Sequence, residues 1–151
     1  MKKIVVFPLI AFLPIFIASF IYRPSAKAVS AENATVFIYR VGQFGAAANN
    51  WAVFADGQKI CKLSNNKFIK HEVAPGKHVY TAKIGGPVLL KKETGVEIDA
   101  EAGKSYYIAC NVKTSITRAR LELLEVTKSS GEKQMAKMSL DNCQEKIDAN
   151  Q

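Results

Sequence analysis

The chain has 151 residues, of which 48% are hydrophobic and 23% are charged, and its formal net charge is +8. This length allows one domain with an appendage and excludes a large multidomain enzyme. The composition is close to the globular average, which excludes a disordered chain, a collagen-like chain and a disulfide-packed miniature protein.

The N-terminal segment has the three parts of a secretory signal peptide. Two lysines precede an uncharged apolar run over residues 4–22, and the small-x-small triplet Ala26-Lys27-Ala28 follows it. We therefore expect residues 1–28 to be a signal peptide cleaved after Ala28, which predicts a periplasmic or secreted mature chain. The run is also long enough to span a bilayer. The alternative is an uncleaved anchor in the inner membrane, with membrane contact only through residues 4–22.

Half of the net charge belongs to this N-terminal segment. Residues 1–28 contain four basic and no acidic residues, so the remaining chain has 17 basic and 13 acidic residues and a net charge of +4. Nucleic-acid-binding domains usually carry a concentrated basic stripe, whereas these charges are spread along the chain. We therefore expect no nucleic-acid partner.

The mature region consists of short strand-like runs separated by turn signals. Alternating, β-branched and aromatic residues predict eight strands, at Thr35–Arg40, Trp51–Ala55, Gln58–Leu63, Lys67–Val73, His78–Lys83, Glu93–Asp99, Ser105–Val112 and Arg118–Val126. The Asp56-Gly57 pair predicts a tight hairpin, because glycine accepts a positive φ without a Cβ clash. The regular spacing of the strands is typical of an all-β fold, and predicts a small antiparallel β-sandwich over residues 29–128.

Residues 129–151 are expected to form a partly ordered C-terminal extension. Ser129 and Glu132 match a capping box, which predicts a short helix ending at Met138. The alternative for the same residues is a final β-hairpin. The polar tail beyond them is expected to be loosely ordered unless Cys143 ties it to the domain.

The turns and strands together resemble a known bacterial family. The motifs occur in this order: Asp56-Gly57, Lys62–Asn66, Ala74–His78, Glu101–Tyr107 and Arg118–Leu123. They resemble the family catalogued as domain of unknown function 2846, and the Pro-Gly-x-His turn is similar to PEGA-type surface domains. The resemblance implies an exported β-sandwich of the cell envelope and implies no activity. The chain departs from lipidated relatives because no cysteine precedes Cys61, so no lipid-acceptor cysteine follows the signal segment.

The residues needed for catalysis are sparse. A nucleophilic hydrolase needs a serine or cysteine beside a histidine base, and His71 and His78 are the two histidines of the chain. We expect His71 to be a partly buried strand residue and His78 to serve a structural role in its turn. The sequence has no Gly-x-Ser-x-Gly elbow, no phosphate-binding loop and no His-Glu-x-x-His pair. We therefore expect a chain that is not an enzyme and has no cofactor.

The three cysteines predict a disulfide and no metal site. Neither cysteines nor histidines fall at the C-x-x-C or H-x-x-x-H spacing of metal ligands. In an exported protein we expect one disulfide and one remaining thiol. Cys143 lies in the polar tail and is expected to be bonded, with Cys61 or Cys110 as its partner. The remaining thiol is expected to be buried and unreactive.

Four residues are candidates for ligand binding. Arg118 and Arg120 are expected on one face of a strand, where two guanidinium groups could bind a carboxylate or phosphate. The alternative is a solvated face neutralised by Glu122. Tyr107 and Trp51 are candidate aromatic anchors, although the alternation around Trp51 favours a place in the core.

These observations favour an exported, non-enzymatic envelope module that binds an envelope protein or a surface ligand. The alternative is a small binding protein for an anionic ligand held by Arg118 and Arg120. The sequence leaves the oligomeric state open.

Overall fold

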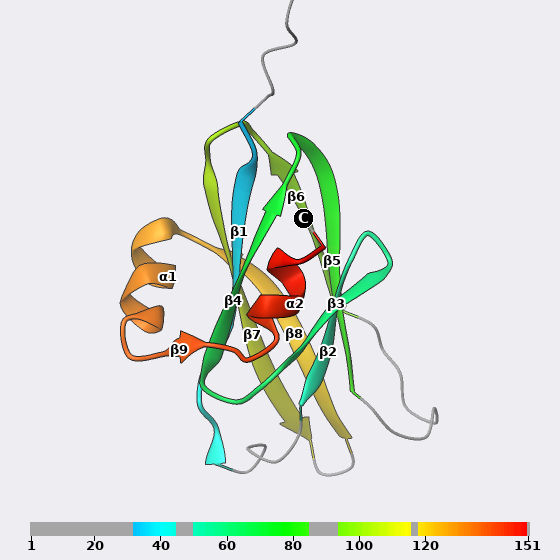
Figure 1. Ribbon diagram of the computed structural model, residues 1–151. Helices are drawn as coiled ribbons and strands as arrows, with labels where there is room; N and C mark the ends of the chain where they lie inside the picture. The colour runs from blue at the N-terminus through cyan, green and yellow to red at the C-terminus, as the bar shows by residue number, and fades with distance from the viewer. Residues whose placement is uncertain (1–31, 45–49, 85–93, 116–117, 151) are drawn as a thin grey trace, which may run out of the picture.

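A computed structural model describes residues 32–44, 50–84, 94–115 and 118–150. Within these residues, nine strands form two sheets that pack face to face (Figure 1). The predicted all-β sandwich is confirmed. The expected signal peptide or anchor over residues 1–28 lies outside the described part. Among the described residues, no helix is long and apolar enough to cross a membrane.

Sheet A has five strands in the order β8-β7-β1-β4-β9. Their bounds are Ala34–Arg40 for β1, Lys67–Val73 for β4, Ser105–Ser115 for β7, Arg118–Val126 for β8 and Ser139–Leu140 for β9. β1 is antiparallel to β4 but parallel to β7, and β9 is parallel to β4. These two parallel pairs depart from the expected antiparallel pairing. They arise because long connections, which contain other elements, join the paired strands where a hairpin would force antiparallel directions.

Sheet B has four strands in the order β3-β2-β5-β6 and is antiparallel throughout. Their bounds are Trp51–Ala55 for β2, Gln58–Leu63 for β3, Gly76–Ile84 for β5 and Thr94–Ala100 for β6. Asp56 and Gly57 join β2 to β3 with φ values of 49° and 80°. This is the left-handed conformation that the Asp-Gly pair predicts for a tight hairpin.

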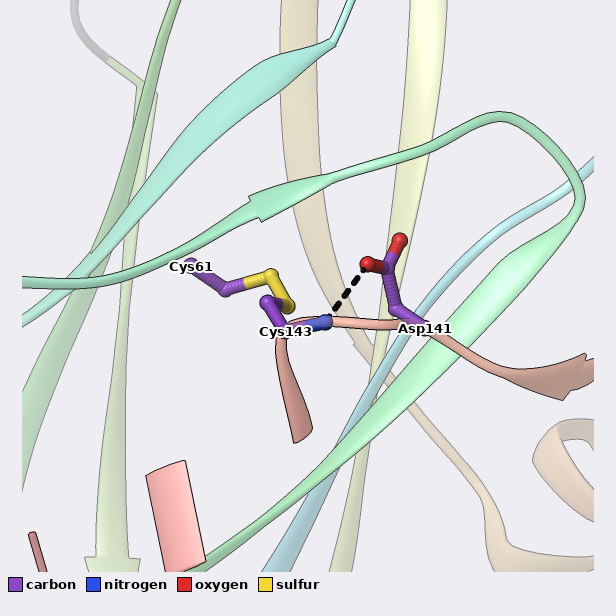
Figure 2. Close-up of side chains that lie close together, drawn as sticks. All are labelled: Cys61, Asp141 and Cys143. Carbon is purple, nitrogen blue, oxygen red and sulfur yellow. Dashed lines mark hydrogen bonds between the residues drawn. A yellow bond between two sulfur atoms is a disulfide. The ribbon is translucent and has the colours of Figure 1, made fainter. Parts of the chain in front are cut away.

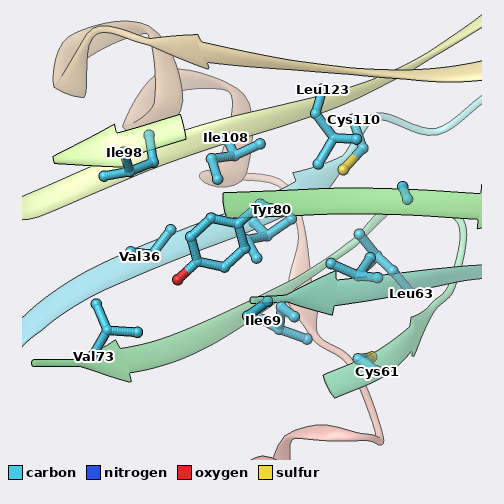
Figure 3. Packing of buried hydrophobic residues seen from close by; sticks show 14 of the residues in the cluster. Val36, Cys61, Leu63, Ile69, Val73, Tyr80, Ile98, Ile108, Cys110 and Leu123 are labelled. Carbon is cyan, nitrogen blue, oxygen red and sulfur yellow. The ribbon is translucent and has the colours of Figure 1, made fainter. Parts of the chain in front are cut away.

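The hydrophobic core lies between the two sheets. Trp51, Val53 and Ala55 of β2 are buried, whereas Ala52 and Phe54 between them are partly exposed. Figure 3 shows the Tyr80 ring of β5 between the sheets, close to Val36 and Ile108 of sheet A. Burial of a side chain of this size stabilises the fold by about 1.5–3 kcal/mol. The period-two pattern of the strands therefore supplies most of the apolar contact between the sheets.

Helix α1 (Lys128–Met135) packs on the outer face of sheet A. The Tyr107 hydroxyl of β7 donates a hydrogen bond to Glu132 Oε1 at 3.2 Å. The buried Gly131 lies directly over the same ring, where a Cβ would come within 2.6 Å of Tyr107 Cγ. A small residue at this position allows the helix backbone to approach the sheet.

The structure forms the predicted short helix and not the alternative hairpin, but the expected capping box is wrong. Ser129 and Glu132 lie inside α1, and its N-cap residue, Thr127, makes no side-chain capping bond. The helix begins earlier than expected, at Lys128, and the Gly131 N–H closes its first turn by a bond to the Thr127 carbonyl at 2.9 Å.

The C-terminal residues fold back onto both sheets. β9 pairs with the start of β4, and helix α2 (Gln144–Asp148) follows and lies beside β3 and β4 (Figure 1). Ile147 of α2 is buried in the hydrophobic core. The extension thus closes the side of the sandwich between β3 and β4.

Candidate functional site

The outer face of sheet B carries lysines around one aromatic ring. Ala52 and Phe54 alternate with the buried residues of β2 and therefore point outward. The register places Lys59 of β3 opposite Phe54, and places Lys62 of β3 and Lys83 of β5 opposite Ala52. Residues opposite each other in neighbouring strands share a face of the sheet. These five residues therefore form one surface, which we call the lysine–phenylalanine surface.

The lysine–phenylalanine surface is partly open to solvent, because its two β3 lysines are exposed whereas Ala52, Phe54 and Lys83 are half-buried. Lys59 and Lys62 are exposed, and Lys83 Nζ lies 4.9 Å from the centre of the Phe54 ring, where the ring attracts a cation. The strands β2, β3 and β5 contain no Asp or Glu. The described helices lie elsewhere, α1 on sheet A and α2 beside β3 and β4 (Figure 1).

This surface was missed in the sequence because its residues come from three strands. A lysine in an alternating strand usually indicates only a solvated face. The signal that could have found it is the absence of acidic residues from three neighbouring strands, but that signal needs the pairing order of sheet B.

The two candidate aromatic anchors are buried. Trp51 is 1% exposed, in the core, and the Arg40 guanidinium carbon lies 5.8 Å from the centre of its ring. Tyr107 is 4% exposed beneath α1 and stacks on Phe37, with ring centres 5.1 Å apart. Neither ring is part of the lysine–phenylalanine surface.

The two candidate arginines lie at the start of β8. The backbone of Arg118 pairs with Ser115, and that of Arg120 pairs with Lys113 of β7. Their side chains lie outside the described part of the structure, so their predicted role in anion binding stays a prediction.

His78 joins two turns of the sandwich. Its Nδ1 lies 2.7 Å from Asp56 Oδ2 and its Nε2 lies 2.8 Å from the Ala74 carbonyl oxygen. Both partners are acceptors, so this geometry favours the charged imidazolium, the form in which both ring nitrogens donate. Burial acts to lower the pKa of His78, but the bonds to Asp56 and Ala74 and the Asp56 charge outweigh burial and raise it. With both nitrogens occupied, His78 offers no lone pair to a reacting group.

His71 lies between the sheets and contacts Tyr80. Its Nδ1 is 3.0 Å from the Tyr80 hydroxyl, and the two rings meet edge to face. Burial, assisted by the nearby His78 charge, lowers the pKa of His71. Burial also raises the pKa of Tyr80, so the hydrogen bond joins a neutral phenol to a neutral imidazole. This geometry agrees with the expectation of a partly buried strand residue.

A disulfide joins Cys61 of β3 to Cys143, and it decides between the two pairings left open for Cys143. Figure 2 shows the Asp141 carboxylate beside this disulfide. Asp141 is 5% exposed, and it accepts hydrogen bonds from the Ser64 N–H at 2.7 Å and the Cys143 N–H at 3.1 Å. The Asp141 carboxylate therefore holds the C-terminal segment beside the end of β3.

Cys61, Cys143 and Asp141 are also residue types that bind metals, with ligand atoms within 4.8 Å of one another. In the disulfide, however, the two sulfurs are bonded to each other and are not thiolates, the form in which cysteine binds metal ions. In its oxidised form, the cluster therefore acts as a structural link.

Cys110 is the remaining thiol, and it is 1% exposed in the core. Burial raises the pKa of Cys110 to about 12, although the nearby Arg40 charge acts in the opposite direction. The thiol is therefore protonated and inert in the folded state, as the sequence predicts for the unpaired cysteine.

Comparison with known proteins identifies one family. A model of a family of proteins of unknown function, DUF2846, matches residues 30–122. The match confirms the resemblance found in the turn and strand motifs. It ends before α1, β9 and α2, which lie at residues 128–148. No curated protein matches the chain.

Proposed function

This chain belongs to the DUF2846 family of proteins of unknown function, and we propose that it is an exported, non-enzymatic module of the cell envelope. It binds the acidic face of another envelope protein through the lysine–phenylalanine surface. The observation that carries the proposal is the outer face of sheet B, where the exposed Lys59 and Lys62 of β3 share a face with the half-buried Phe54, and where the strands β2, β3 and β5 have no carboxylate.

Charge and shape support a protein partner of acidic character. A sheet face is flat, and an aromatic ring within a polar surround is a frequent anchor in protein interfaces. Lys59 and Lys62 would meet carboxylates at the edge of such an interface and speed the encounter. The carboxylates of sheet B strands lie on β6, where Glu97 pairs with Lys77 at 2.9 Å, so they leave the β3 side positive.

A membrane surface fits this face less well. Each lysine near an anionic bilayer contributes about 1 kcal/mol, so three lysines contribute about 3 kcal/mol. A single myristoyl chain binds a bilayer more strongly than these lysines would, with a binding constant of about 10⁴ M⁻¹, and yet it attaches a protein only marginally. The binding test must therefore distinguish a protein partner from an anionic bilayer.

Site-specific photo-crosslinking in intact cells tests the proposal. A photoreactive phenylalanine derivative at position 54 is expected to form one defined protein adduct. The same derivative at the exposed Ala136, after α1, is expected to leave that adduct unformed. Adducts to lipid alone, or the same adduct from both positions, would contradict a protein partner at sheet B.

Charge reversal tests the lysines directly. Lys59→Glu with Lys62→Glu is expected to reduce the adduct at position 54 at least tenfold. The matched control, Lys133→Glu with Lys137→Glu, changes the net charge equally at exposed positions remote from the surface. If both pairs reduce the adduct equally, the effect is one of overall charge and the proposed surface is wrong.

Export is tested separately by intact mass measurement on fractionated cells, with thiols alkylated before and after reduction. A soluble envelope species beginning at Val29 with one free thiol is the expected result. A full-length species in the membrane fraction with three free thiols would contradict export and place the domain in a reducing compartment.

A second candidate function is the binding of a small anion near the β7–β8 turn. The register supports it, because Arg120 pairs with Lys113 and Arg118 lies two residues away. Calorimetric titration with inorganic phosphate is the test. If Arg118→Ala with Arg120→Ala leaves the phosphate affinity unchanged, this alternative is wrong.

A further inference from the structure

The native disulfide does not join cysteines that are neighbours in the order of the chain. It joins the first and third cysteines of the chain, Cys61 and Cys143, which are 82 residues apart. Cys110 lies between them and stays unpaired. The two other pairings would span 49 residues, from 61 to 110, and 33 residues, from 110 to 143. The native pair therefore closes the longest of the three loops.

Loop entropy favours the wrong pairs in an unfolded chain. The probability that two chain positions meet falls roughly as the −3/2 power of their separation. The 33-residue loop therefore closes about four times, and the 49-residue loop about twice, as readily as the native loop. On this ratio, about one unfolded chain in seven would form the native pair first. During export from the N-terminus, Cys61 and Cys110 also emerge before Cys143.

The folded structure favours the native pair by contacts that need a formed sandwich. Asp141 bonds to the Ser64 N–H, and its own N–H bonds to the Phe68 carbonyl at 2.8 Å. Ile147 enters the core. Each of these contacts uses a group that β3, β4 or the turn between them positions. Cys143 is therefore brought to Cys61 only after the strands have assembled. Random pairing of the cysteines takes place earlier, in the unfolded chain.

We propose that the native disulfide is reached by thiol–disulfide exchange in which Cys110 is the leaving group, so that the exported chain is a substrate for disulfide isomerisation. This inference rests on the proposed export, since only an oxidising compartment forms the first disulfide. A disulfide oxidant supplies that first bond, and each molecule of oxidant is reduced to two thiols.

The exchange itself needs no further oxidant or reductant. From the Cys61–Cys110 disulfide, the Cys143 thiolate attacks Cys61 Sγ, the new S–S bond forms, and Cys110 leaves as a thiolate. From the Cys110–Cys143 disulfide, the Cys61 thiolate attacks Cys143 Sγ and Cys110 leaves again. In both cases one S–S bond breaks and one forms, and the departing thiolate takes a proton from water.

Burial of Cys110 makes the exchange one-way. The folded core leaves this side chain 1% exposed and holds its pKa at about 12, whereas an unperturbed thiol has a pKa near 8.5. At pH 7.5 almost none of the buried group is thiolate, the form that attacks disulfides. The released Cys110 therefore cannot reverse the reaction while the sandwich is folded.

Oxidative refolding of the full chain tests the route. The reduced, denatured chain is diluted into a buffer of oxidised and reduced glutathione, and the disulfides are trapped by alkylation and mapped by mass spectrometry. We expect most molecules to carry a Cys110-containing disulfide at first and then to convert to Cys61–Cys143. Direct appearance of the native pair, without such species, would mean that folding buries Cys110 before oxidation and would overturn the proposal.

Two variants isolate the role of Cys110. Cys110→Ala cannot form either wrong pair, so its native disulfide is expected to appear in one phase and faster than in the natural chain. Cys143→Ala cannot undergo the exchange, so it is expected to retain a Cys61–Cys110 disulfide. The mapping of the natural chain needs no variant, so the proposal stays testable if either substitution impairs folding. Equal rates for Cys110→Ala and the natural chain would overturn it.

A catalytic amount of a thiol–disulfide isomerase with a Cys-x-x-Cys site is expected to speed the conversion in the natural chain and to leave Cys110→Ala unchanged. Alkylation in intact cells then separates this inference from the proposed export. Three free thiols in cells together with exchange in vitro would contradict export alone. One free thiol in cells without exchange in vitro would contradict the inference alone.

Discussion

The side-chain amide of Gln144 binds both backbone groups of Lys70 as a neighbouring β-strand would. The Lys70 N–H donates to Gln144 Oε1 at 2.8 Å, and Gln144 Nε2 donates to the Lys70 carbonyl at 2.8 Å. Just before this point, β9 pairs with Lys67 and Phe68 of β4. An open strand edge is a site of unwanted pairing with other chains. The C-terminal extension therefore closes the β4 edge with a two-residue strand and one amide.

Loss of this amide is expected to weaken the β4 edge. Gln144→Ala removes both bonds to Lys70 and should lower the free energy of unfolding by about 1–2 kcal/mol, measured by urea denaturation. Exchange of the Lys70 amide hydrogen should also become faster. Gln134→Ala is the matched control, since Gln134 is exposed on α1 and bonds to Ser130. Equal effects of the two substitutions would contradict the role given to Gln144.

For the substitution Gly131→Ala, helix propensity and packing predict changes of opposite sign in the stability of the protein. In an exposed helix, Gly→Ala stabilises by about 1 kcal/mol. Here a Cβ would overlap the Tyr107 side chain, so Gly131→Ala should destabilise the protein by about 1–3 kcal/mol. Thermal unfolding measures the change, with Ser129→Ala at an exposed position of the same helix as control. A more stable Gly131→Ala protein would show that α1 does not pack closely on sheet A.

The His78–Asp56 pair is expected to lose its stabilising effect as the pH rises. The pKa of folded His78 lies above its ordinary value of 6.5, so the folded state binds the proton more tightly than the unfolded state. The contribution is fully present below pH 6.5 and is lost as the pH rises through the folded pKa. Asp56→Asn should therefore destabilise the protein more at pH 6 than at pH 9. NMR titration of the imidazole provides the direct check, and a His78 midpoint below 6.5 would refute the pairing.

Titration of His71 is expected to change the stability with pH in the direction opposite to that of His78. Its folded pKa lies below 6.5 because burial disfavours the charged ring, with the His78 charge acting in the same sense and Asp56 against it. The unfolded state then binds the proton more tightly, so stability falls as the pH drops below 6.5. His71→Gln keeps a hydrogen-bond acceptor near Tyr80 but cannot titrate. It should flatten the stability curve between pH 6.5 and 5, and an unchanged slope would contradict the lowered pKa.

The disulfide is expected to contribute strongly to stability because it closes a long loop. For the 82-residue separation of Cys61 and Cys143, the chain-entropy model gives about 4.5 kcal/mol, whereas measured effects are typically about 2–4 kcal/mol. Cys61→Ala with Cys143→Ala should lower the free energy of unfolding by about 2–4 kcal/mol. Treatment of the natural chain with a dithiol reductant should have a similar effect. A loss below about 0.5 kcal/mol would indicate that the non-covalent contacts of the C-terminal extension suffice.

The strands could be predicted accurately because the signals that define them are local in the sequence. β2, β3, β4 and β8 begin and end at the expected residues, because alternation and turn residues act within a few positions of the chain. The start of α1 was placed wrongly, since local capping signals at Ser129 and Glu132 were outweighed by the contact of Gly131 with Tyr107. That contact joins residues in different elements, and no local pattern encodes it.

The predictions about the candidate sites likewise succeeded where a local signal was enough and stayed open where a tertiary contact was needed. The sequence indicated that Cys143 is bonded, because a cysteine in a polar tail has no core of its own. The choice of Cys61 over Cys110 depends on which strand the C-terminal extension reaches. The lysine–phenylalanine surface likewise needs the order β3-β2-β5, which brings Lys59, Phe54 and Lys83 onto one face.

By itself, the sequence determined the positions of the strands, the Asp56-Gly57 hairpin and the membership of the family. These depend on side-chain alternation and on backbone conformations that neighbouring residues impose. Only the tertiary structure decided the parallel pairing of β1 with β7, the closure of the β4 edge by Gln144 and the pairing of Cys61 with Cys143. These are contacts between distant parts of the chain. Their free energy arises from packing and from backbone groups that find partners only when both sheets are assembled.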